Sequence, residues 1–137
     1  MKNIVIIFIA LLYISIVTAS AVTVTSASST KIEPGETSTI SLTIENNGKE
    51  DVEEVTISLD LITINLPFVP IESSTQKSIS KIREGDQKRV DFKIQALPDA
   101  KPQIYKIPII IEHDESSESS IVSIEVVSTP KLEVDIE

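Results

Sequence analysis

The sequence contains no cysteine and no tryptophan, and it has only one histidine and three glycines. Without cysteine, the chain has neither a disulfide framework nor a thiolate metal site, so its stability must come from a hydrophobic core. Aromatic residues make up only 4% of the chain. Because binding sites for organic ligands usually use aromatic side chains, this shortage argues against a carbohydrate-binding module.

Motifs of enzymatic chemistry are also missing, since the sequence has no nucleophile elbow and no phosphate-binding loop. The only histidine, His113, lies between Glu112 and Asp114 at the expected end of a strand. A metal site or an acid-base pair is the functional interpretation of that position. One histidine beside solvated carboxylates is more often an ordinary surface residue. The sequence therefore predicts no enzyme and no cofactor.

Basic residues are few, because 12 Lys and Arg stand against 21 Asp and Glu, which gives a formal net charge of -9. An acidic surface repels phosphate backbones and anionic lipids, so nucleic-acid binding is not expected. Glu112, Asp114, Glu115 and Glu118 cluster in one loop, and their oxygens suit Ca²⁺. Their spacing matches no standard calcium loop and lacks an inward-folding glycine, so they are only a weak calcium candidate.

The first 21 residues have the pattern of a secretory signal peptide. Lys2 provides a charged start, residues 4–17 form an apolar run, and Ala19 and Ala21 have the A-x-A arrangement that signal peptidases accept. We therefore predict export with cleavage after Ala21. The alternative is an uncleaved membrane anchor, because no charge occurs between Lys2 and Lys31 and a span of about 20 residues fits there.

Residues 22–128 consist of short runs, rich in Ile and Val, in which apolar and polar side chains alternate. This alternation is typical of strands that bury one face. About seven such runs at regular spacing predict an all-β sandwich. Its expected core consists of alternating residues of these strands, namely Ile40, Leu42, Ile44, Val55, Ile57, Leu59, Val90, Phe92, Ile94, Ile107 and Ile109.

The segment from Glu33 to Leu61 shows the alternation most clearly. Two alternating runs, 40–44 and 55–61, stand on either side of Asn47-Gly48. An Asn-Gly pair supplies the positive φ of a tight turn, so the sequence predicts a β-hairpin with Gly48 in its turn.

Two further segments do not fit regular strands of this domain. Pro67 and Pro70 exclude a regular central strand, so residues 66–69 are expected to close one end of the sandwich. Residues 129–137 alternate again, with no domain left to bury their apolar face. We interpret them as a linker and the first strand of a following module, or alternatively as a strand donated to another subunit.

Several motifs occur together in a fixed order. A turn at Pro34-Gly35, an alternating strand, the turn at Gly48 and a second strand precede "DAKPQIY", which spans residues 99–105. This order resembles the S-layer-domain-like, CARDB-related immunoglobulin-like modules of archaeal and bacterial cell-surface proteins, over nearly all of residues 22–128. The sequence departs from the family pattern at Glu84 and Gln103, where the family commonly has Pro and Gly.

The resemblance implies an immunoglobulin-like antiparallel β-sandwich of about seven strands that acts as a non-catalytic spacer or adhesion module of a cell-surface protein. Its partners would be other surface modules or further copies of itself, and only an uncleaved segment 1–21 would touch a membrane. The implied structural residues are the turn glycines Gly35, Gly48 and Gly85, together with Tyr105 in a tyrosine corner. The alternatives are a carbohydrate- or Ca²⁺-dependent binding module and a fibre subunit that assembles by strand addition.

Overall fold

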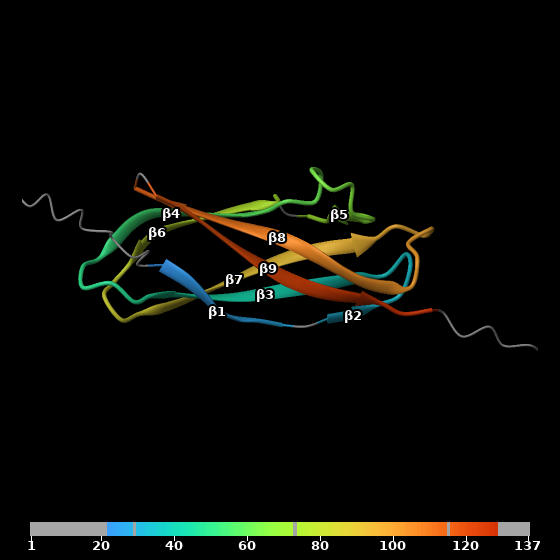
Figure 1. The fold of residues 1–137 in the computed structure, drawn as a ribbon, viewed down its shortest axis with the longest axis horizontal. Helices are drawn as coiled ribbons and strands as arrows, with labels where there is room; N and C mark the ends of the chain where they lie inside the picture. The colour runs from blue at the N-terminus through green and yellow to red at the C-terminus, as the bar shows by residue number, and fades with distance from the viewer. Residues whose placement is uncertain (1–21, 29, 73, 115, 129–137) are drawn as a thin grey trace, which may run out of the picture.

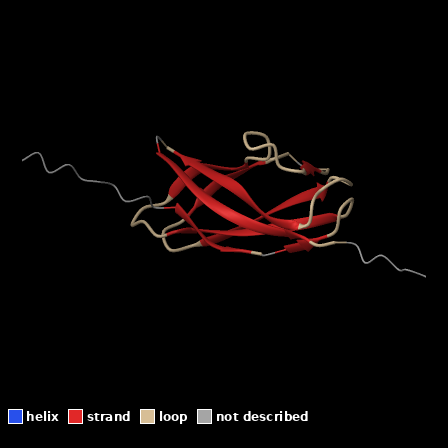
Figure 2. Ribbon diagram, turned by 45° about the vertical axis from the view of Figure 1, so that its right-hand side comes forward, coloured by secondary structure: helices blue, strands red, loops and turns tan. Residues whose placement is uncertain are grey.

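The computed structural model describes residues 22–28, 30–72, 74–114 and 116–128. These residues form nine strands and no helix (Figure 2). The predicted signal peptide and the alternating tail, residues 1–21 and 129–137, lie outside the described residues. The strands are β1 (Val22–Ala27), β2 (Thr30–Ile32), β3 (Thr37–Asn46), β4 (Val52–Leu59), β5 (Phe68–Pro70), β6 (Gln76–Ile82), β7 (Gln87–Ala96), β8 (Gln103–His113) and β9 (Ser116–Val126).

The strands form two sheets that face each other as a sandwich (Figure 1). Sheet A has four strands in the order β1-β3-β7-β5, and sheet B has five strands in the order β2-β9-β8-β4-β6. All neighbouring pairs are antiparallel except β2 and β9, which pair in parallel. The predicted all-β sandwich is confirmed.

The predicted hairpin between residues 33 and 61 is wrong, because β3 lies in sheet A and β4 lies in sheet B. The chain crosses between the sheets through residues 47–51, and the buried side chain of Asn46 holds this crossing. Its Nδ2 donates to the carbonyls of Glu50 (2.7 Å) and Ile82 (3.0 Å), and its Oδ1 accepts from the Gly48 N–H (2.9 Å). Gly48 does not adopt positive φ, so an asparagine side chain takes the place of the predicted Asn-Gly turn.

The core lies between the sheets and consists of the inward-facing residues of the alternating strands. Every predicted core residue is buried except Val90, which is half-buried and packs against the buried cluster. Further buried positions include Val22, Ile32, Leu61, Phe68, Ile82, Ile111, Val122, Ile124 and Val126. The period-two pattern therefore identified the buried faces of the strands.

Two strands of three residues each, β2 and β5, raise the number of described strands from the expected seven to nine. β5 forms an edge of sheet A, where Pro70 is tolerated because an edge strand needs fewer backbone donors. Phe68 of β5 is buried and Leu66 packs against the core. The segment thus closes the sandwich, as expected, but does so as a short edge strand.

The chain enters and leaves the sandwich at opposite ends of its longest axis (Figure 1). Val22 begins β1 and pairs with Asn46 at one end. Val126 ends β9 and pairs with Gln103 and Ile32 at the other end.

Candidate functional site

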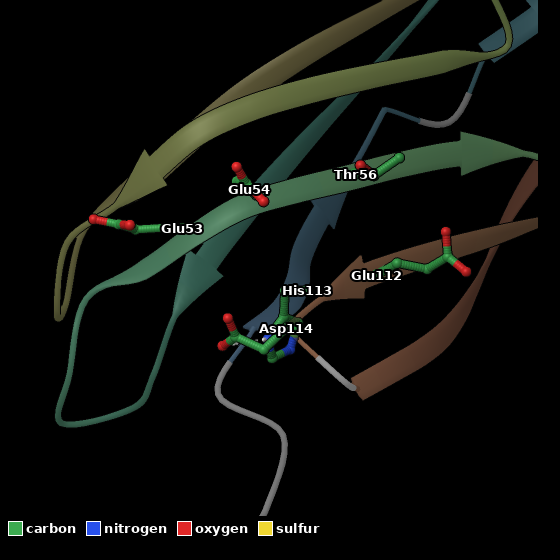
Figure 3. Close-up of a pocket in the computed structure, with 6 residues that line it drawn as sticks. All are labelled: Glu53, Glu54, Thr56, Glu112, His113 and Asp114. Carbon is green, nitrogen blue, oxygen red and sulfur yellow. Dashed lines mark ion pairs between the residues drawn. The ribbon is translucent and has the colours of Figure 1, made fainter.

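A pocket of about 360 Å³ lies at the end of the sandwich where β1 begins. β4 and β8 are neighbours in sheet B, and their pairing begins with Thr56 opposite Glu112. The pairing brings acidic residues from both strands to one place. The pocket is lined by Glu53, Glu54 and Thr56 from β4 and by Glu112, His113 and Asp114 at the end of β8 (Figure 3).

The backbone at this pocket is unusual, because Glu54 (φ 52°) and Asp114 (φ 48°) have positive φ. Few non-glycine residues adopt this conformation. Asp114 lies in the turn that joins the paired residues His113 and Ser116. Glu54 marks the point on β4 just before its pairing with β8 begins.

His113 is buried, with 6% of its side chain exposed, so the expectation of a surface histidine was wrong. It continues the inward-facing series Ile107, Ile109 and Ile111 of β8 and therefore points between the sheets. Neither of its ring nitrogens has a hydrogen-bond partner among the described residues. Its Nδ1 lies 3.9 Å from the Asp114 Oδ2, which is beyond hydrogen-bond distance.

Among the described residues, the imidazole of His113 has no hydrogen-bonded partner in the pocket. Figure 3 shows the carboxylate of Glu112 directed away from the imidazole of His113. What the pocket offers is the carboxylates of Glu54 and Glu112, which have no ion-pair partner among the described residues, whereas Glu53 pairs with Lys81 (3.7 Å).

The calcium candidate is not supported by the positions of its described members. Glu112 faces outward from β8, whereas Glu118 lies opposite the inward-facing Ile111 and therefore belongs to the other face. Asp114 lies in the turn, and Glu115 is outside the described residues. No group of three or more His, Cys, Asp or Glu side chains in the described part of the chain is arranged to hold a metal ion. The calcium site stays a prediction.

The turn glycines differ from one another. Gly35 (φ 83°) and Gly85 (φ 73°) adopt the positive φ that favours glycine, whereas Gly48 does not. The Gly85 N–H donates to the Asn46 carbonyl (2.9 Å), which ties the β6–β7 turn to the β3–β4 crossing.

Tyr105 has the contacts of a tyrosine corner. Its hydroxyl donates to the Lys101 carbonyl (2.9 Å), and its ring meets Phe68 edge to face with 5.4 Å between centroids. Phe68 and Phe92 are buried. In the described part of the chain, no aromatic ring is exposed, so a sugar has no aromatic platform there.

Surface groups of the sandwich have shifted pKa values, and one of them, Lys81, pairs with the pocket residue Glu53 (3.7 Å). A hydrogen bond from Lys81 is the main cause that lowers the pKa of Asp51, and the same bond raises the pKa of Lys81. A hydrogen bond from Lys93 likewise lowers the pKa of Glu72. Hydrogen bonds from Thr63 and Ser41, respectively, are the leading causes that lower the pKa values of Asp60 and Asp91.

The described part of the chain contains no helix that is long and apolar enough to cross a membrane.

The chain belongs to the CARDB family, whose model matches residues 17–121. This match covers most of the sandwich and confirms the family part of the resemblance. No curated protein matches the sequence detectably.

Solved structures support the fold. A family 123 glycoside hydrolase from Clostridium perfringens is similar over 74% of this chain and 23% of its own, with a TM-score of 0.52 and 20% identity. An E. coli alpha-2-macroglobulin is similar over 79% of this chain and 7% of its own, with a TM-score of 0.57 and 14% identity. The chain thus spans about a quarter or less of these two proteins.

A chain of the human seminal-plasma complex between zinc 2-glycoprotein and prolactin inducible protein is similar over 77% of this chain and 93% of its own. Its TM-score is 0.54 and its identity is 10%. At these identities the likeness concerns the sandwich fold alone.

Proposed function

We propose that this chain is a non-catalytic structural module of an S-layer-like cell-surface protein, in which it acts as a spacer or an adhesion element. The observation that carries the proposal is the entry and exit of the chain at opposite ends of the long axis. A folded module with this geometry separates whatever precedes it from whatever follows it by its own length. Membership of CARDB, a family of domains that are typically extracellular, supports the same role.

The absence of enzymatic activity is part of the proposal. It is supported by the pocket at the start of β4 and the end of β8, where the imidazole of His113 is buried and lies beyond hydrogen-bond distance of Asp114. An acid-base pair acts through a hydrogen bond, and its reacting group must reach the substrate.

Export through the signal peptide is the second part of the proposal and rests on the sequence of residues 1–21. Mass spectrometry of the protein from its producing cells should find a chain that starts at Val22. Recovery of an intact N-terminus from membranes would support the uncleaved anchor instead.

The edges of the described sheets give little support to the alternative of a fibre built by strand addition. β2 and β5 have three residues each, and β5 ends in Pro70. β1 has a register shift between Val24 and Ser26. Lys77 of β6 and Glu118 of β9 lie opposite inward-facing residues, so each directs a charged side chain to the inner side of its sheet. Natural sheets use these devices to prevent edge-to-edge pairing.

A module replacement tests the spacer role directly. In the producing cell, residues 22–128 are exchanged for an unrelated immunoglobulin-like sandwich of similar length whose ends also lie at opposite poles. A spacer predicts that surface assembly of the protein survives the exchange. Loss of assembly, with export intact, would show that surface residues of this module bind a partner.

A further inference from the structure

The outer face of sheet B carries an apolar patch at its centre. Ile121 of β9 is 60% exposed and lies directly opposite Pro108 of β8. Ile110, two residues further along β8, is half-buried on the same face. We call Pro108, Ile110 and Ile121 the apolar patch. Ser58 and Ser119 lie on either side of Ile110, and such small side chains allow another flat surface to approach closely.

Two opposite charges border the patch along the same strand. Lys106, Pro108, Ile110 and Glu112 are alternate residues of β8, so their side chains share the outer face. Neither Lys106 nor Glu112 forms an ion pair with another described residue.

The outer face of sheet A differs in this respect. Its Arg89 pairs with Asp91 (3.0 Å), and its Lys93 pairs with Glu72 (2.8 Å). The basic side chains of that face are therefore already neutralised within the chain, whereas Lys106, the basic residue that borders the apolar patch, has no such ion pair among the described residues.

We propose that the apolar patch is a self-association surface, on which a second copy of this chain stacks face to face with its β8 antiparallel to the first. The two-fold axis lies between sheet B of one copy and sheet B of the other. It runs perpendicular to the β8 strands and passes opposite Ile109. It places Pro108 of each copy over Ile110 of the other. It also places Lys106 of each copy over Glu112 of the other, so the dimer contains two such ion pairs and each border charge is neutralised.

The charge order selects this arrangement over the parallel one. If the two β8 strands ran in the same direction, Lys106 would face Lys106 and Glu112 would face Glu112. Like charges placed opposite each other suppress association. A chain with a formal net charge of -9 repels its own copies over most of its surface, and this face offers matched opposite charges around an apolar centre.

The acidic pocket adds to the attraction. Glu112 lines that pocket together with Glu54, and neither carboxylate has an ion-pair partner among the described residues, whereas Glu53 pairs with Lys81 (3.7 Å). The antiparallel arrangement brings Lys106 of the second copy to this end of β8, where it adds a positive charge beside Glu112.

Antiparallel stacking has a consequence for the whole molecule. Because each chain enters and leaves its sandwich at opposite ends, the two copies extend in opposite directions. Two molecules anchored on opposing cell surfaces would meet in this arrangement. The inference goes beyond the proposed function and does not depend on it.

Sedimentation equilibrium tests the proposal by comparing the purified protein with variants in which Lys106 or Glu112 has the opposite charge. The unchanged chain should show a concentration-dependent monomer-dimer equilibrium. Lys106→Glu alone and Glu112→Lys alone should each weaken it by at least about tenfold, because each creates like-charge contacts. The two variants mixed in equal amounts should form a heterodimer, and the double variant should regain dimerisation.

Controls separate this surface from general effects. Lys101→Glu makes the same charge change at an exposed lysine outside sheet B and should leave dimerisation unchanged. Ile121→Asp should abolish dimerisation while circular dichroism shows an intact fold, because Ile121 is exposed. A chain that stays monomeric up to about 1 mM, or a dimer that is indifferent to these reversals, would overturn the proposal.

Discussion

Two polar side chains, Asn46 and His113, are buried near the end of the sandwich where β1 begins, but they differ in their surroundings. Asn46 is fully buried and makes three hydrogen bonds to backbone groups. His113 is 6% exposed, and its ring nitrogens have no hydrogen-bond partner among the described residues.

The difference follows from what surrounds each side chain. Residues 47–51 and the β6–β7 turn close around Asn46, so backbone groups replace the water that its amide loses. His113 is carried inward by the alternation of β8, at a place where its neighbours are a turn and an acidic pocket. A buried polar group without a partner costs about 1–3 kcal/mol. The two side chains should therefore contribute to stability with opposite signs.

The largest loss of stability is expected for a substitution in the apolar centre of the core, midway between the ends of the sandwich. Its effect on the free energy of unfolding is the reference for the two polar residues. Phe92 is 1% exposed. Phe92→Ala should lower the free energy of unfolding by about 3–5 kcal/mol, because it removes a large side chain and leaves a cavity. Urea unfolding measures this value, and a loss below about 1 kcal/mol would contradict the described core.

Asn46→Ala should have the second largest effect and lower the free energy of unfolding by about 2–4 kcal/mol. It leaves the Ile82 and Glu50 carbonyls and the Gly48 N–H without their side-chain partner. Asn47→Ala is the matched control. Asn47 is exposed, and among the described residues its amide donates only to the Thr23 hydroxyl, so Asn47→Ala should lower the free energy of unfolding by no more than about 0.5 kcal/mol. Equal effects of the two substitutions in urea unfolding would refute the distinction.

His113→Leu should act in the opposite direction and raise the free energy of unfolding by about 1 kcal/mol. Leucine has a similar size and removes two nitrogens that lack partners among the described residues. Thermal melting at neutral pH detects the change, with Ser117→Ala on the exposed part of β9 as the neutral control. A clear drop in melting temperature would mean that the imidazole is satisfied in solution.

The smallest expected effect is the pH dependence of the stabilisation by Asp51, a residue in the loop that encloses Asn46. Asp51 accepts a hydrogen bond from the Glu84 N–H (3.0 Å) and pairs with Lys81 (2.9 Å), and its pKa is lowered. A carboxyl whose pKa is lower in the folded chain stabilises it above its unfolded pKa of about 3.9, and this contribution is lost as the pH falls through the folded pKa. Asp51→Asn should therefore destabilise slightly at pH 7 and not at about pH 2. A difference that persists in acid would exclude this cause.

The sequence predicted the strands better than their partners. Alternation at Ile40, Leu42 and Ile44 identifies a buried face, because the side-chain period of a strand is local. It does not reveal the sheet that a strand joins, and so the Asn47-Gly48 pair suggested a hairpin where the chain crosses between sheets. The five residues between β3 and β4 were a signal against a two-residue turn.

The buried polar residues could not be assigned from the sequence for a similar reason. Asn46 is paired by groups such as the Ile82 carbonyl, 36 residues away, and only the folded chain brings them together. His113 was expected on the surface because its neighbours in sequence are acidic, whereas the inward series of β8 determines its burial. Lys106 and Ile121 were not singled out, because a patch across two strands depends on their register.

Location outside the cell is the central claim of the account, and surface labelling of intact producing cells tests it most directly. A membrane-impermeant reagent that modifies amines should reach the exposed lysines, among them Lys49 and Lys101, and mass spectrometry can quantify each modified peptide. The account predicts that these lysines are modified on intact cells to the same extent as after lysis. Modification only after lysis would contradict it.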